Sequence, residues 1–179
     1  MRQTWKRPEK LSPWDLAYTV VMALACLISY RVSTYAMSLF VEERSELLGG
    51  MWAVVATVFV FRDTRVHSLS AGIGRLSATL VSFALCLAYL LIFPFTPAGM
   101  AALIGIGTLV MMLLGWRDDI ITTGITTAVV MVVAGMSPLD AWHQPLLRLI
   151  ETVIGIATGV AGTWIGSSVF FKLTGKPVR

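Results

Sequence analysis

Residues 76–116 read LSATLVSFALCLAYLLIFPFTPAGMAALIGIGTLVMMLLGW, and this run of 41 residues contains no charged side chain. Two further runs, 120–139 and 152–171, also lack charge. A helix needs about 20 apolar residues to cross a bilayer core about 30 Å thick. The longest run is therefore long enough for two membrane-spanning helices. Its middle, PFTP at 94–97, has proline at both ends, which predicts a tight turn between them.

The composition of the whole chain agrees with this interpretation. Of its 179 residues, 56% are hydrophobic and only 13% are charged, and the mean hydropathy is +0.78. Soluble domains carry about 25% charged residues. The composition excludes a soluble enzyme, a nucleic-acid-binding domain and a disulfide scaffold. The two cysteines, Cys26 and Cys86, lie inside apolar runs and are interpreted as small buried hydrophobic residues.

The charge pattern predicts an all-α membrane protein with six transmembrane helices. We expect a transmembrane domain over residues 16–171, between a tail at 1–15 and a tail at 172–179, with no room for a soluble domain. The predicted spans are 16–40, 47–61, 73–93, 100–116, 120–136 and 142–171.

The positions of Lys and Arg predict the orientation of the chain. With six spans, ten of these cations lie on the side that holds both tails, and Arg44 alone lies on the other. Loops rich in Lys and Arg stay in the cytoplasm. We therefore expect both termini to be cytoplasmic, and the basic pI to reflect topology rather than nucleic-acid binding. Four tryptophans at the predicted span ends are typical of an interfacial aromatic belt: Trp14, Trp52, Trp116 and Trp142.

A short motif occurs twice. The pattern R-L-x-x-T-x-x-x-x-A appears at 75–84 and again at 148–157, and Ala-Val-Val appears in the preceding spans at 53–55 and 128–130. Three helices separate the copies, so the second is inverted relative to the first. Inverted repeats are a common construction in transporters, whose binding sites lie near the repeat interface. We predict two inverted three-helix repeats, at about 16–93 and 100–171.

Three arginines within spans, Arg31, Arg75 and Arg148, are the main candidate site residues. An arginine at the centre of a helix in the bilayer costs at least about 2.5–3.5 kcal/mol, so such residues usually face a cavity or a partner. The alternative is that they snorkel to the interface or pair internally. Thr79 and Thr152 lie one turn beyond Arg75 and Arg148 and join them as candidates for substrate binding.

The sixth span carries two further features. Glycines recur on the face that begins at Arg148, and this spacing favours close helix packing; the alternative is a groove for a flat anionic substrate. Glu151, three residues after Arg148, is either its ion-pair partner or a carboxylate that couples transport to protons. The predicted packing residues are Gly155, Gly159, Gly162 and Gly166.

Several chemistries have no counterpart in the sequence. No glycine-rich phosphate loop is followed by Lys and Ser or Thr, which argues against ATP-driven pumping by this chain. Metal-ligand clusters and a Ser/His/Asp set on one side of the membrane are also missing. We therefore predict that the protein is not an enzyme and that it uses neither a metal nor a cofactor.

Two segments resemble a known family. The first is ELLGGMWAVV at 46–55, followed by Arg65 and by Arg75-Leu76; the second is 115–166, with RLIETVIG at 148–155. Together they resemble the membrane part of the fusaric acid resistance and aromatic acid exporter family, over roughly residues 15–170. Plant anion channels of the malate type look like more distant relatives.

The resemblance implies a transporter of the bacterial inner membrane that exports organic anions, in particular aromatic carboxylates. We expect Arg31, Arg75 and Arg148 to attract the anion, with Glu151 and the two threonines beside them. The expected partners are the lipid bilayer, the organic anion and further copies of the chain, as a homodimer or larger homo-oligomer. The alternatives are a passive anion channel, or a non-transporting membrane subunit that binds a partner through the glycines of the sixth helix.

Overall fold

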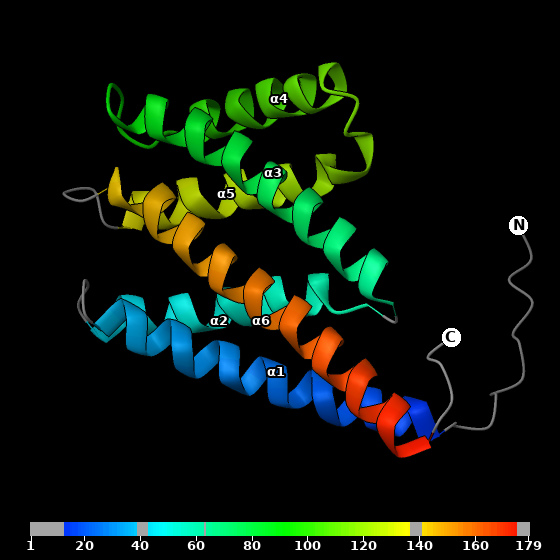
Figure 1. Ribbon diagram of the computed structural model, residues 1–179. Coiled ribbons are helices and arrows are strands. Elements are labelled where there is room, and N and C mark those ends of the chain that lie inside the picture. The colour runs from blue at the N-terminus through cyan, green and yellow to red at the C-terminus, as the bar shows by residue number, and fades with distance from the viewer. Residues whose placement is uncertain (1–12, 39–42, 63, 137–140, 175–179) are drawn as a thin grey trace, which may run out of the picture.

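The computed structural model describes residues 13–38, 43–62, 64–136 and 141–174, and these residues form helices and short connections without any strand. The prediction of an all-α fold with six long helices is confirmed (Figure 1). The outer parts of the predicted tails and the turn at 137–140 lie outside the described residues. The helices are α1 (Pro13–Ser38), α2 (Glu43–Val60), α3 (Arg65–Leu90), α4 (Pro97–Leu113), α5 (Ile120–Met136) and α6 (His143–Thr174), with a 3-10 turn η1 (Arg117–Asp119) before α5.

Four helical segments are long and apolar enough to cross a membrane: α1, α3, α6, and α5 together with η1. The apolar part of α2, Gly49–Val60, and the 17-residue α4 are shorter. A helix of 17 residues is about 26 Å long, slightly less than the apolar core of a bilayer. Length and composition therefore support four of the six predicted spans, and α2 and α4 lie alongside the longer helices (Figure 1).

Local sequence explains where α4 begins and ends. Thr96 caps the helix by accepting a hydrogen bond from the Gly99 amide at 3.0 Å, and Pro97 occupies the first turn, where its missing N–H is no loss. Gly115, with φ of +79°, reverses the chain after the helix. The helix thus starts three residues earlier and ends three residues earlier than the predicted span 100–116.

The helices pack in two matching groups. The first group contains the contacts α1–α2, α1–α6, α2–α6 and α2–α3, the second contains α4–α5, α4–α3, α5–α3 and α5–α6, and α3 packs on α6 between them. Exchanging α1 with α4, α2 with α5 and α3 with α6 maps this set of contacts onto itself. The symmetry supports the predicted inverted repeat. The start of α1 and the end of α6 lie at the same end of the bundle (Figure 1).

Buried serine and threonine hydroxyls form hydrogen bonds between the helices of the bundle. The hydroxyl of Thr57 in α2 lies 2.8 Å from Ser29 Oγ in α1 and 3.1 Å from the Gly155 carbonyl oxygen in α6. In the other group, Ser82 of α3 donates to the Thr123 carbonyl of α5 at 3.0 Å. Large apolar side chains such as Leu16, Ile73, Leu113 and Ile165 point outward instead. Lipid contact suits this outer surface, and hydrogen bonds between small residues join the helices inside.

Candidate functional site

Arg148 and Glu151 form a buried ion pair near the start of α6. The Nη1 atom of Arg148 donates to Oε2 of Glu151 at 2.6 Å, and each residue is only 5% exposed. Residues three apart face the same side of a helix, which brings the two groups together. The guanidinium also lies over the ring of Trp52 in α2, with Cζ 3.9 Å from the ring centroid. The two interactions hold the guanidinium in one place between α2 and α6.

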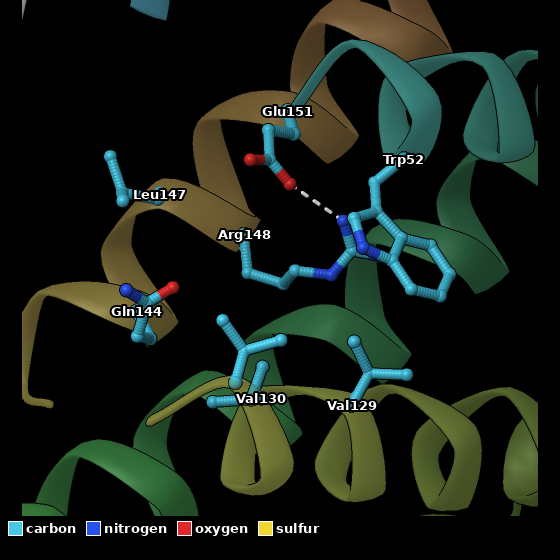
Figure 2. A pocket seen from close by; sticks show the side chains of 8 residues that line it. Trp52, Val129, Val130, Gln144, Leu147, Arg148 and Glu151 are labelled. Atoms are coloured by element: carbon cyan, nitrogen blue, oxygen red, sulfur yellow. Dashed lines mark hydrogen bonds and ion pairs between the residues drawn. The ribbon is translucent and has the colours of Figure 1, made fainter. Parts of the chain in front are cut away.

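This pair lines an open pocket between α2, α5 and α6. The pocket is small, with a volume of about 30 Å³, and its walls are Trp52, Val129, Val130, Val133, Gln144, Leu147, Arg148 and Glu151. The charged groups lie at one side of it, and the valines of α5 form an apolar wall (Figure 2). A ligand with one anionic group and an apolar body matches this division of the lining.

Not every N–H donor of the Arg148 guanidinium is bonded to a described residue. Its Nε atom is buried and has no hydrogen-bond partner among the described residues. Figure 2 shows Glu151 on one side of the Arg148 side chain and the valines Val129 and Val130 on the other. Arginine binds carboxylates through two parallel N–H groups. The Nε–H of Arg148 is therefore a buried donor that no described residue satisfies, on an edge of the guanidinium that Glu151 does not occupy.

Arg75 in α3 is the counterpart of Arg148 in the repeated motif, and its surroundings differ. It is 4% exposed, and its Cζ lies 4.8 Å from the ring centroid of Phe59 in α2. Within the described part of the chain, it makes neither an ion pair nor a side-chain hydrogen bond, and its buried Nε is unpartnered. The guanidinium of Arg148 is close enough to act on it electrostatically. Arg75 is thus a buried cation without a described counter-ion.

One face of α2 carries both aromatic rings. Trp52 and Phe59 are seven residues apart, which is about two helical turns, so both rings project from the same side about 10.5 Å apart along the axis. Trp52 lies in the first turn of the apolar part of α2, Gly49–Val60, and its place in an interfacial belt stays a prediction. The sequence argument missed both rings as site residues, although their spacing was the signal that could have found them.

The family described as fusaric acid resistance protein-like matches residues 34–162. The chain belongs to this family. The match includes both buried arginines, Glu151 and the two rings of α2, whereas Arg31 lies before it. Family membership makes the protein a membrane transporter or resistance protein of the fusaric acid type. No curated protein and no solved structure matches the chain significantly.

Of the other predicted substrate residues in this fusaric acid resistance family member, two are buried in the protein and one is exposed on its surface. Thr79 is buried, and its hydroxyl donates to the Arg75 carbonyl at 2.9 Å, so it turns back onto its own helix. Thr152 is also buried in α6. Arg31 is exposed on α1, whose packed face carries Ala25, Ser29, Ser33 and Met37. The structure thus brings Arg75, Arg148 and Glu151 into one region and leaves Arg31 apart from them.

The four glycines of α6 face neighbouring helices. A Cβ at Gly155 would meet the Ala53 carbonyl oxygen, and one at Gly159 would lie 3.0 Å from the Thr57 carbonyl oxygen, both in α2. At Gly162 and Gly166 the nearest atoms belong to α1, with Ala25 and Val21 each 3.0 Å away, and Phe61 also lies 3.0 Å from Gly162. At Gly155 and Gly159 this face is filled by α2, whereas Gly166 also borders an open apolar groove of about 380 Å³ between α1 and α6. The prediction of close packing describes these contacts better than a substrate groove does.

In the described ranges, no group of three or more His, Cys, Asp and Glu side chains is placed to hold a metal ion.

Proposed function

We propose that the protein exports organic anions, and aromatic carboxylates in particular, across the bacterial inner membrane. The observation that carries this proposal is the pair of buried guanidiniums, each over an aromatic ring of α2 and one of them lining a pocket with an apolar wall. Membership of the fusaric acid resistance family supports the same class of substrate.

The pocket beside Arg148 suits the two parts of an aromatic acid. The carboxylate would bind the free Nε edge, where charge-assisted hydrogen bonds are short and strong. The ring would lie against Trp52 and the valines Val129, Val130 and Val133. An aromatic acid buries the apolar surface of its ring when its carboxylate binds. A small inorganic anion has no apolar surface to bury and is therefore bound less favourably.

The proposed path runs from Arg75 to Arg148. The excess of Lys and Arg on the side of both tails supports cytoplasmic termini, and on that orientation the connection at 61–64 is cytoplasmic. Phe59 is close to that connection, so the guanidinium above it is the inner of the two. Arg148 lies above Trp52, about two turns further out.

We also propose that the protein works as a homodimer. Arg31 is exposed on α1 beside Ile28, Val32 and Tyr35, which are 54%, 45% and 71% exposed. A cation on such an apolar face is costly against lipid, and a second copy would shield it. Light scattering of the purified protein in detergent tests the assembly. A monomeric particle contradicts it.

Flux from liposomes tests the transport function. Vesicles loaded with radiolabelled 4-hydroxybenzoate at alkaline pH, where almost no neutral acid remains to leak, are compared with protein-free vesicles. We expect Arg75→Gln and Arg148→Gln to reduce efflux strongly and Arg31→Gln to reduce it less. Arg65→Gln is the matched control, because Arg65 is exposed and bonds to Ser167 and Ser168 away from the pocket.

The same assay separates the alternatives. Undiminished efflux in all three site variants contradicts the role of the arginines. An ion current through the wild-type protein without any gradient of protons favours a passive channel. Wild-type vesicles that release the anion no faster than protein-free vesicles favour a non-transporting subunit.

A further inference from the structure

We propose that Glu151 promotes release of the anion. It offsets the charge of Arg148, so that an anion arriving from Arg75, which has no ion-pair partner among the described residues, is held more weakly at Arg148 and leaves. The inference rests on the proposed function, since it assigns a role within the same site. Its basis is the difference between two arginines that the repeat places in equivalent positions.

The two guanidiniums share their burial and their aromatic contact. Arg75 is 4% and Arg148 is 5% exposed, and each has a ring of α2 beside it and an unpartnered Nε. The cost of removing each guanidinium from water is therefore similar for the two arginines. The carboxylate 2.6 Å from Arg148 is the charge that distinguishes them. An anion at Arg75 meets a full positive charge, whereas one at Arg148 meets a pair whose net charge is close to zero.

Glu151 is held where it can act on an incoming anion. It lines the same pocket as Arg148, so a carboxylate bound at the Nε edge would have a like charge across the guanidinium. On its other side, Oε1 faces α2 at Gly49, where a Cβ would lie 2.9 Å from it. The absence of a side chain at Gly49 makes room for the carboxylate, and the close backbone keeps it beside Arg148.

A purely structural ion pair makes the opposite prediction for binding. If Glu151 only holds Arg148 in position, its neutral isostere Gln loosens the guanidinium and weakens anion binding. If Glu151 promotes release, Glu151→Gln leaves Arg148 as a buried cation that the anion alone can neutralise. Binding then becomes tighter and release slower. The sign of the change in affinity distinguishes the two roles.

The test measures binding of 4-hydroxybenzoate to the purified full chain in detergent, by calorimetry and by thermal unfolding. We expect Glu151→Gln to bind about tenfold more tightly, because a like charge near the bound carboxylate is gone. Its Tm without ligand is lower than that of the wild type, and the ligand raises this Tm by more. Efflux of the same compound from liposomes is slower. Asp118→Asn, a carboxylate-to-amide change in the η1 turn, is the control and leaves the affinity unchanged.

A second variant covers the case in which Glu151→Gln does not fold. Glu151→Asp keeps the charge and draws it back from Arg148 by one methylene, and we expect an affinity between those of the wild type and Glu151→Gln. Wild-type binding with no tightening in the folded variants overturns this inference alone. Wild-type protein that does not bind the compound overturns the proposed function, and the release role with it.

Discussion

Arg75 and Arg148 begin the two copies of one motif, yet they lie in different electrostatic surroundings. Both are buried, and each guanidinium lies over a ring of α2, but only Arg148 has an anionic partner among the described residues. The partner comes from one position of the motif, where the second copy has Glu151 and the first has Ala78. The comparison teaches that the repeat sets where the cation lies, whereas a single neighbouring residue sets its net charge.

The same contrast extends to the helix contacts that follow each arginine. Seven residues beyond Arg148, Gly155 lets α6 approach the backbone of α2. Seven residues beyond Arg75, Ser82 instead bonds to α5, donating to the Thr123 carbonyl at 3.0 Å and accepting from Thr127 at 3.1 Å. The contact at Gly155 thus requires a residue without a side chain, whereas the contact at Ser82 requires a hydroxyl group.

The largest expected effect is a difference in the free energy of unfolding between variants of Arg148 and of Arg75. Arg148→Gln leaves Glu151 buried without its counter-ion, and we expect a loss of about 3–5 kcal/mol in the free energy of unfolding. Arg75→Gln removes an unpaired buried charge and is expected to cost far less. Denaturant unfolding in detergent measures both. The double change Arg148→Gln with Glu151→Gln should recover most of the loss, and equal losses in the two single variants would break the comparison.

A smaller effect is expected at the glycine interface. Gly155→Ala drives a Cβ into the Ala53 carbonyl oxygen and the Ala56 side chain, and overpacking of this kind costs about 1–3 kcal/mol. Gly105→Ala in α4 is the matched control, because a Cβ there meets nothing within 4 Å. Thermal unfolding should show a clear decrease in Tm for the first variant and none for the second. A decrease of similar size in both would mean that α6 does not depend on close approach.

The interface between α3 and α5 should be destabilised when the hydroxyl of Ser82 is removed. Ser82→Ala removes both the donor to Thr123 and the acceptor for Thr127, and we expect a destabilisation of about 1 kcal/mol. Ser77→Ala serves as the comparison, since that hydroxyl bonds only within its own helix, to the Ile73 and Gly74 carbonyls. If the two variants have the same Tm, the contact of α3 with α5 does not rest on these bonds.

An effect comparable to that of Ser82→Ala is expected for the rings beside the two arginines. A cation over an aromatic face contributes about 0.5–2 kcal/mol, and Trp is the strongest partner. We expect Trp52→Leu to cost more stability than Phe59→Leu, because its ring is larger and lies 3.9 Å rather than 4.8 Å from the guanidinium carbon. Trp116→Leu, in the exposed connection between α4 and η1, is the control. A larger loss at Phe59 would reverse the expected order.

Features that depend on nearby residues could be predicted from the sequence. The six helices follow from charge-free runs, and the turn at 94–97 follows from its prolines. The pairing of Arg148 with Glu151 was one of two interpretations, because three residues on a helix always lie close. α2 starts at Glu43, four residues before the predicted span 47–61, and Glu43 and Glu46 lie in its first turn. Acidic residues favour exactly such a helix start through the helix dipole.

Contacts between distant segments could not be predicted in the same way. Trp52 and Arg148 are almost one hundred residues apart, and nothing near either residue specifies that they meet. The placement of Arg31 on an exposed face could not be predicted either, because polar and apolar residues are mixed around α1 and do not indicate which side packs. The direction in which a membrane helix faces is decided by small residues and hydrogen bonds between helices rather than by a hydrophobic stripe.

The hydroxyl of Thr57 gives the junction of α1, α2 and α6 a mechanical property. Its single proton has several acceptors within reach: Ser29 Oγ, the Ala53 and Gly155 carbonyl oxygens, and Thr158 Oγ1. A hydroxyl donates to one acceptor at a time and rotates freely to choose it. When one helix slides by a fraction of an ångström, the proton can change acceptors before any bond is lost. Small sliding movements of the three helices can therefore leave the Thr57 hydroxyl with an acceptor throughout.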